Sequence, residues 1–203
     1  LILYDDQAGV NAARLWWVLR TYGFNQVRLL NGGLQSWKDA RGPLVSEWET
    51  LPANRFEFPP EEALHLRIDK DELASLMTSE DWTLIDARTA EEHSGKRMKK
   101  GSQNAGHIPG SVHIDWADAV DYHRTKKFLT PEKLQVAYRE LPEEKDAPVV
   151  VYCHSGVRSA HTSFVLTQLL GYNRVYNYDG SWLEWSSLEG APIDKDSTTL
   201  ILQ

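Results

Sequence analysis

The sequence of 203 residues contains very little cysteine: Cys153 is the single one. One cysteine cannot form a disulfide within the chain, which excludes a disulfide scaffold and two-cysteine redox chemistry of the thioredoxin kind. A free thiol is kept reduced most readily in the cytoplasm, so we expect a cytoplasmic location. If Cys153 reacts, it must hold its intermediate without the help of a second thiol.

Long apolar runs and an excess of basic residues are missing as well. No run reaches the length of about eighteen residues that crosses a membrane, and the start, Leu1–Asp6, lacks the basic region of a signal peptide. Lys and Arg number 22 against 29 Asp and Glu, a net charge of -7, so we expect neither a nucleic-acid nor a membrane partner. Because a lone cysteine and no histidine pair at ligand spacing are present, we expect no metal site.

The sequence does contain an internal repeat, displaced by 148 positions. Its glycine and tryptophan residues stay in phase without a gap, which chance similarity rarely achieves. The matching pairs are Tyr4 and Tyr152, Ala12 and Ala160, Gly23 and Gly171, Asn25 and Asn173, Val27 and Val175, Gly32 and Gly180, Trp37 and Trp185, and Gly42 and Gly190. We interpret them as two copies of one unit.

Each copy has the pattern of a strand, a helix and a second strand. The strands are predicted from short continuous apolar runs, and the helix from an amphipathic stretch that ends at a glycine. The segments are 1–4, 11–22 and 27–30 in the first copy and 149–152, 159–170 and 175–178 in the second. Units of this kind form a parallel sheet with helices on its faces, so the predicted fold class is α/β.

Only the second copy is preceded by further elements. We predict helices at 69–77 and from Thr130 onwards, and strands at 82–85 and 111–114. Residues 67–195 therefore form a complete catalytic domain, 46–66 a linker, and 1–45 the C-terminal part of a first, non-catalytic domain. Because the counterpart of 68–148 would precede residue 1, we expect a fragment of a longer protein, whose open strand edge favours pairing with another chain.

The chemistry of the second copy centres on Cys153. It follows the strand 149–152 and precedes a helix, where backbone N–H groups and the helix dipole, roughly half a positive charge, lower the pKa of a thiol. Gly156 lets the loop curl around a bound anion, and Arg158 adds positive charge. The first copy has Asp5 at the matching position, so only the second can be a thiol enzyme. The alternative is a buried structural cysteine, as most free cysteines are.

Four motifs resemble the signatures of the rhodanese family, the thiosulfate sulfurtransferases. The loop Tyr152–Ser159 (YCHSGVRS) resembles their active-site loop. The others, in family order, are Asp86-Ala87-Arg88 with Glu92 and Gly95, then Gly106–Ser111 (GHIPGS), then Asp179–Trp182 (DGSW). The first copy resembles the non-catalytic N-terminal domain of tandem rhodaneses.

This resemblance implies a ping-pong reaction without a cofactor. The thiolate of Cys153 takes the outer sulfur of a small anionic donor such as thiosulfate and passes it from a persulfide to cyanide or a thiol. The substrate-binding candidates are His154, Ser155, Gly156, Val157, Arg158, Arg88 and Glu92. Arg158 either binds the donor or pairs with Glu92, and we expect Arg88 and Asp86 to bond to each other or to nearby backbone. Glu92 stands where members that use mercaptopyruvate carry an arginine, which favours thiosulfate and leaves mercaptopyruvate as the alternative.

Two other functions compete with this prediction. A cysteine phosphatase also needs a cysteine, a loop and an arginine, but its loop has five intervening residues, and four separate Cys153 from Arg158 here. The second alternative is a sulfur-binding or regulatory module without turnover. A basic segment, Lys96, Arg97, Lys99 and Lys100, is either a solvated loop or a guide for anions toward Cys153.

Overall fold

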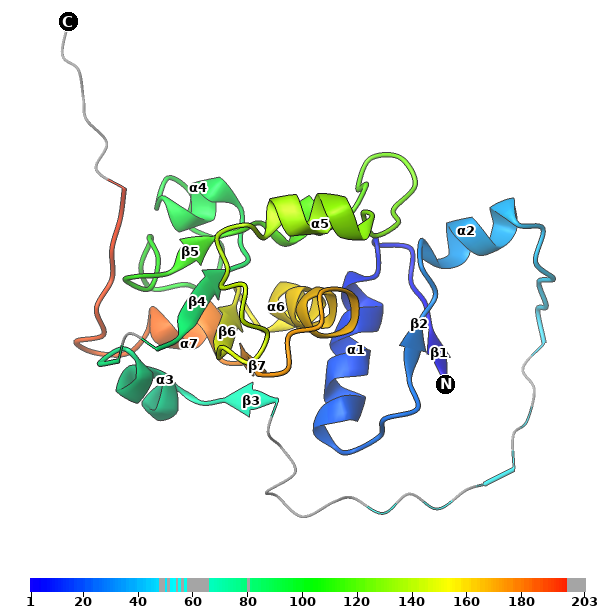
Figure 1. The fold of residues 1–203 in the computed structure, drawn as a ribbon, viewed down its shortest axis with the longest axis horizontal. Helices are drawn as coiled ribbons and strands as arrows, with labels where there is room; N and C mark the ends of the chain where they lie inside the picture. Colours follow the sequence, from blue (N-terminus) through cyan, green and yellow to red (C-terminus); the bar gives the residue numbers. More distant parts are fainter. Residues whose placement is uncertain are drawn as a thin grey trace, which may run out of the picture.

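The computed structural model describes residues 1–47, 50, 52, 53, 55, 57, 66–79 and 81–196, so most of the predicted linker 46–66 lies outside it. The larger of its two sheets is entirely parallel (Figure 1). Its strands, in spatial order, are β3 (Arg67–Ile68), β7 (Val175–Tyr178), β6 (Val149–Tyr152), β4 (Thr83–Asp86) and β5 (Val112–His113). The predicted α/β fold is confirmed.

Strand β6 lies at the centre of this sheet and is buried on both faces. Val149 and Val151 point to the side of α5 (Pro131–Ala137) and α6 (Val157–Phe164), and Cys153 continues this row. Val150 and Tyr152 point to the opposite side, against α3 (Lys70–Leu76) and α7 (Ser181–Trp185). A strand covered on both faces needs apolar residues throughout, which explains its continuous apolar run.

The predicted elements of residues 67–195 agree with the structure to within a few residues. Strands 149–152 and 175–178 have the predicted bounds, and helix 159–170 is observed as α6 followed by a π-helical segment, Val165–Leu169. Three short elements escaped prediction: β3, α4 (Ala90–His93) and a 3-10 turn, Trp116–Ala119. Each is too short to produce a recognisable period.

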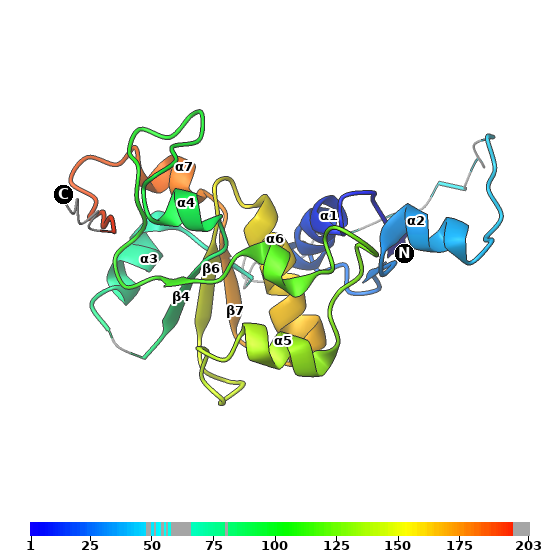
Figure 2. The same ribbon diagram turned by 90° about the horizontal axis from the view of Figure 1, so that it is seen from above.

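Residues 1–45 form a smaller unit beside α6. Its elements are β1 (Ile2–Leu3), α1 (Val10–Thr21), β2 (Arg28–Leu29) and α2 (Gly33–Asp39), with β1 and β2 parallel. Helix α1 packs against α6, and Trp16 meets Phe164 edge to face with ring centroids 5.0 Å apart. Helix α6 is therefore covered by the large sheet on one side and by α1 on the other (Figure 2). Assignment of residues 1–45 to a domain of their own stays a prediction.

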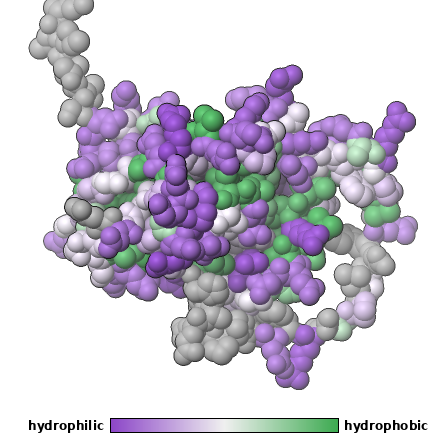
Figure 3. All heavy atoms as spheres, viewed as in Figure 1, coloured by the Kyte–Doolittle hydropathy of each residue, from purple (hydrophilic) through white to green (hydrophobic). Residues whose placement is uncertain are grey.

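The outer side of this smaller unit is apolar. A cavity of about 350 Å³ is lined by Ile2, Tyr4, Leu30, Leu34, Trp37, Pro43, Leu44 and Val45. Apolar surface in the region of β1 and β2 is visible in Figure 3. Pairing of this surface with another chain remains a prediction.

Among the helices in the described ranges, none has both the length and the hydropathy needed to cross a bilayer.

The carboxylate of Asp86 joins β4 and β6, which are neighbours in the large sheet. It lies at the end of β4 with no exposed surface, and it accepts hydrogen bonds from Arg88 Nη2 at 2.6 Å and from Tyr152 Oη, at the end of β6, at 2.9 Å. His93 Nδ1 lies 2.9 Å away, on α4. Burial alone would raise the pKa of Asp86, but the bonds from His93 and Arg88 hold this pKa well below its usual range.

We predict that Asp86→Asn lowers the free energy of unfolding by about 3–5 kcal/mol, because the buried Arg88 loses its counter-charge. Since folding depresses the pKa of Asp86, its stabilisation is present above the ordinary aspartate pKa of about 4 and is lost as the pH falls toward the folded value. Urea denaturation at several pH values measures both effects. The exposed Asp81→Asn is the matched control, and equal stability of the two variants would contradict the prediction.

Candidate active site

Cys153 lies at the carboxyl end of β6, directly before helix α6. Its side chain is buried, with 1% of the residue exposed, and Ser159 Oγ lies 3.5 Å from its sulfur. Ligands gather at the carboxyl ends of parallel strands, and the N-terminus of a helix favours an anion there. The fold therefore places the only cysteine where a thiolate is most easily stabilised.

The hydroxyl group of Ser181 holds both ends of the cysteine loop. Its Oγ accepts the backbone N–H of Cys153 at 3.2 Å and that of Gly156 at 3.0 Å, and it donates to Tyr178 O at 2.8 Å. All three hydrogen-bonding positions of the hydroxyl are thereby used. Ser181 has φ 54°, a left-handed conformation that is uncommon for residues other than glycine.

Glycine is favoured at position 156 for two independent reasons. Its φ is +81°, where glycine carries no steric cost, and a Cβ at this position would collide with the carboxylate of Asp179. The residue forms the N-cap of α6, so the loop turns here into the helix. The predicted role of Gly156 in shaping the loop agrees with this geometry.

Arg158 forms a two-point ion pair with Glu92. Its Nη1 lies 2.7 Å from Glu92 Oε2 and its Nη2 lies 2.9 Å from Oε1. Glu92 is 3% exposed, and its backbone is placed by α4, whose N-terminal capping box joins it to Thr89. Of the two roles considered for Arg158, the structure therefore shows the pairing with Glu92.

The pKa of the Cys153 thiol lies below its ordinary value. Burial alone would raise this pKa, but the charge of Arg158 and hydrogen bonds from Ser159 and from the backbone of Ser155 outweigh it. A lower pKa means a larger fraction of thiolate, the nucleophilic form, near neutral pH. The electrostatic setting predicted from the sequence is thus present around the sulfur.

The first unit shows how such a loop holds an anion. The carboxylate of Asp5, the counterpart of Cys153, accepts four backbone N–H groups at 2.8–2.9 Å, those of Gln7, Gly9, Asn11 and Ala12. The displacement of 148 residues matches these donors to Ser155, Val157, Ser159 and Ala160. The loop before a helix therefore forms an anion cradle in this fold, and in the first unit a carboxylate of the chain itself occupies it.

The remaining candidates are unevenly placed. His154 and Val157 flank Cys153 and Gly156 in the loop, and Ser155 is exposed at its rim. Arg88, predicted to bind substrate, is 1% exposed, donates to Asp86 and to Gly106 O, and lies 4.5 Å over the Trp182 ring. The guanidinium group of Arg88 is thus committed to buried partners, among them the Asp86 carboxylate to which we expected it to bond, and its contact with substrate stays a prediction.

The basic segment Lys96, Arg97, Lys99 and Lys100 is exposed throughout. Lys99 of this segment lies near His154. The pKa of His154 is lowered first by burial and second by the charge of Lys99. Positive charge therefore lies near one side of the cysteine loop, on a protein whose net charge is -7.

Several functional side chains carried too weak a signal in the sequence. Ser181 belongs to the DGSW motif. The motif indicated its position but not that its hydroxyl accepts the N–H groups at both ends of the cysteine loop. Ser159 is the last residue of the motif YCHSGVRS, but the motif gave no indication that its hydroxyl lies against the sulfur. Asn177 lies inside β7, fully buried, with Nδ2 3.3 Å from Gly156 O. A buried amide in an apolar strand was the available signal for it.

Three potential metal ligands do lie near one another, although we predicted no metal site. Ligand atoms of His93, His107 and Asp196 fall within 4.8 Å of each other. The two imidazole rings are stacked, with centroids 3.8 Å apart and planes at 12°. In stacked rings the lone pairs lie in nearly parallel planes, which is poor geometry for binding one ion together.

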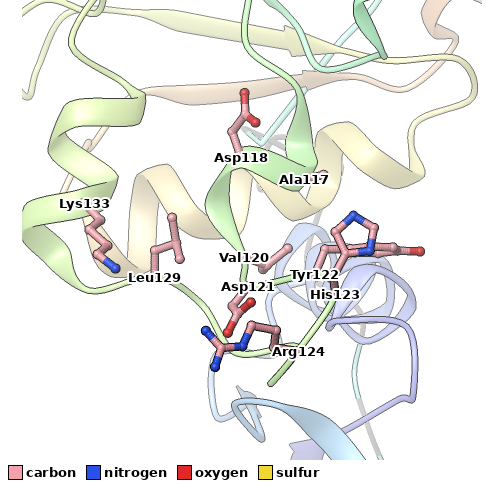
Figure 4. A pocket seen from close by; sticks show the side chains of 9 residues that line it. All are labelled: Ala117, Asp118, Val120, Asp121, Tyr122, His123, Arg124, Leu129 and Lys133. Carbon is pink, nitrogen blue, oxygen red and sulfur yellow. The ribbon is translucent and has the colours of Figure 1, made fainter.

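Figure 4 shows a hollow whose lining includes no residue of the cysteine loop. Its volume is about 490 Å³, and it is lined by Ala117, Asp118, Val120, Asp121, Tyr122, His123, Arg124, Leu129 and Lys133. None of these residues contributes to the Cys153 site. Chemical features, and not the size of a hollow, therefore locate the candidate active site.

Fold and site together define a class: a parallel α/β domain with a single thiolate in an anion-binding loop before a helix. The chain belongs to the rhodanese family, since the family model described as Rhodanese-like domain matches residues 69–188. The resemblance found in the sequence is thereby confirmed.

Individual relatives agree with this assignment. The "Sulfur carrier protein TtuD" of Thermus thermophilus is 38% identical over 203 residues, 96% of this chain and 70% of the relative. A "Putative thiosulfate sulfurtransferase" of Mycolicibacterium smegmatis is 37% identical over 204 residues, 97% of this chain and 72% of the relative.

Solved structures of EanB are also similar. One, described as a complex with ergothioneine covalently linked with a persulfide cysteine, has a TM-score of 0.82 at 25% identity. The wild-type structure has a TM-score of 0.78 at 26% identity. Each match covers 96% of this chain, which spans about half of the matched chain, 50% in both cases.

We predict that Arg158→Gln raises the pKa of Cys153 by about one pH unit, because the positive charge that favours the thiolate is lost. The pH dependence of iodoacetamide alkylation, followed by intact mass, measures this pKa on the only thiol. Arg139→Gln, on the exposed surface, is the control. The double variant Glu92→Gln, Arg158→Gln avoids an unpaired buried carboxylate and should show the same direction; an unchanged profile in both would refute the role of Arg158.

Proposed function

We propose that this chain is a sulfurtransferase that moves the sulfane sulfur of thiosulfate to cyanide or a thiol through a persulfide on Cys153. The observation that carries the proposal is the cradle itself. The fold supplies a loop of backbone N–H groups for an anion, and the catalytic copy has a lone thiol of lowered pKa where the first copy has a carboxylate. The names of the rhodanese relatives support the same chemistry.

The reaction has two displacement steps. The Cys153 thiolate attacks the outer sulfur of thiosulfate; the Cys S–S bond forms, the bond to the sulfonate sulfur breaks, and sulfite leaves with the electron pair. Cyanide or a thiolate then attacks the outer sulfur of the persulfide, and the Cys153 thiolate leaves. Backbone N–H groups of the loop serve both anionic states, thiolate and persulfide, without reorganising.

The geometry of Arg158 favours sulfur transfer over phosphate-ester hydrolysis. A phosphatase loop presents its arginine to the phosphate oxygens as a fork. Here both terminal nitrogens of Arg158 are engaged by the buried Glu92, so the guanidinium group supplies charge at a distance and no second anchor. The loop is also one residue shorter, which suits a single sulfur atom.

The choice of sulfur donor follows from the same ion pair between Arg158 and Glu92. Mercaptopyruvate carries a carboxylate that needs a free cationic partner, and Arg158 is already paired. Thiosulfate is a compact anion for which the general positive potential of the basic segment suffices. We therefore favour thiosulfate, with mercaptopyruvate as the alternative donor.

A sulfur carrier that passes its persulfide to another protein is the second candidate. One relative at 38% identity is named a sulfur carrier protein, and the persulfide step is common to both functions. Turnover separates them: an enzyme releases thiocyanate repeatedly with cyanide, whereas a carrier without turnover is discharged only by its own partner.

Intact mass after incubation with thiosulfate tests the persulfide directly. We expect a gain of about one sulfur mass on the native protein, no gain on Cys153→Ser, and loss of the added mass when cyanide is supplied. Mercaptopyruvate and an aryl phosphate are tested in parallel. Hydrolysis of the phosphate without any sulfur gain, in a folded and reduced sample, would overturn the proposal.

A second prediction concerns the basic segment. Replacing Lys99 and Lys100 together by Gln should raise KM for thiosulfate roughly threefold at low salt, because the local positive potential concentrates the anion. The difference from the native protein should shrink at high salt, where charges are screened, and kcat should stay the same. Lys133→Gln on α5 is the matched control. Equal KM values at low salt would show that the segment is only a solvated loop.

A further inference from the structure

The carbonyl group of Gly156 accepts the N–H of Ala160 within α6 at 3.2 Å, and two side-chain donors hold it from outside the cysteine loop. Asn177 Nδ2, from β7, lies 3.3 Å from this oxygen, and Arg14 Nη1 lies at the same distance. Arg14 comes from α1, in the unit that has no nucleophile. The two units therefore meet at the backbone of the catalytic loop as well as through the apolar packing of α1 on α6.

Arg14 is itself firmly placed. Its guanidinium group forms a two-point ion pair with Asp179, the residue that follows β7, with Nη2 3.2 Å from Oδ2. Its Cζ also lies 4.7 Å over the ring of Trp17, whose Nε1 donates to Leu66 O at 3.2 Å. A guanidinium group that is held by a two-point ion pair and by an aromatic ring has a fixed orientation. It can therefore orient the group to which it donates a hydrogen bond.

The direction matters because of peptide geometry. In a trans peptide the C=O and the following N–H point to opposite sides of the chain. Donors that hold the Gly156 oxygen away from the loop centre therefore hold the N–H of Val157 toward it. If this peptide rotated, the cradle would lose one donor and present a carbonyl oxygen to the sulfur anion.

The corresponding peptide of the first unit binds an anion through its N–H group. Gly9 is the counterpart of Val157, and its N–H donates to Asp5 Oδ1 at 2.8 Å. Ala8, the counterpart of Gly156, has φ 59°, close to the left-handed φ of 81° at Gly156. In the first loop, therefore, the N–H that corresponds to that of Val157 binds the central anion, although Gly9 itself has φ 86° and Val157 is the first residue of α6.

We infer that Arg14 is a positioning residue of the persulfide site: through the Gly156 carbonyl, the non-catalytic unit orients the Val157 N–H toward the Cys153 sulfur. This role rests on the proposed sulfur transfer and extends it to a residue outside the catalytic domain. It also assigns a function to a unit whose own cradle is filled by Asp5.

The test compares Arg14→Gln with Arg20→Gln, which removes an arginine from the same helix away from the loop. For Arg14→Gln we expect the alkylation profile of Cys153 to move to higher pH and persulfide formation from thiosulfate to slow roughly three- to tenfold. This loss is smaller than the hundredfold or more that follows complete removal of an anion-hole donor, because Asn177 remains. Arg20→Gln should match the native protein in both measurements.

Arg14→Lys separates orientation from charge, because lysine keeps the positive charge and loses the planar fork. A slowed rate and a raised alkylation pH in both Arg14 variants, at unchanged thermal unfolding temperature, support positioning. A native alkylation profile in Arg14→Gln, or an effect seen only as a lower unfolding temperature, overturns it. Alkylation needs no sulfur donor, so a failure of the proposed function leaves this readout intact.

Discussion

The buried carboxylate of Asp86 is the constraint on which the geometry of the site depends. A carboxylate without exposed surface is tolerated only when its charge and lone pairs are fully engaged, here by Arg88, His93 and Tyr152. These partners join the end of β4 to the end of β6 and to α4. Helix α4 in turn carries Glu92, which fixes Arg158. The charge that lowers the pKa of Cys153 is thus placed through a chain of contacts that begins at Asp86.

The two strand–loop–helix segments that we predict to be copies of one unit illustrate that backbone geometry and nucleophile are separable. Both have a loop at the carboxyl end of a parallel strand, with a residue of positive φ before the helix. In one, four N–H groups bind the carboxylate of Asp5; in the other, a thiol of lowered pKa takes its place. The same electrostatic device can therefore serve stability or catalysis, depending on whether the anion belongs permanently to the chain.

Prediction from the sequence succeeded where one residue type carried strong local information. The apolar runs 149–152 and 175–178 are strands with the predicted bounds, and the predicted helix 69–77 is observed as α3, capped by Asp69. It failed for β3, whose two residues pair only because β7 offers an open edge. The bond between Arg88 and Asp86, two positions apart, was expected, whereas the burial of this guanidinium group against the Gly106 carbonyl, 18 positions away, depends on the folded chain.

The sequence by itself determined the α/β class, the family and the single nucleophile, because periodicity, motif order and the count of cysteines are properties of the chain. Only the tertiary structure decided that Arg158 pairs with Glu92, that Ser181 brackets the loop, and that Arg14 reaches the Gly156 carbonyl. These contacts span 66, 25 and 142 positions. Their strength depends on distances and directions that arise when the strands and helices pack, and no local pattern encodes them.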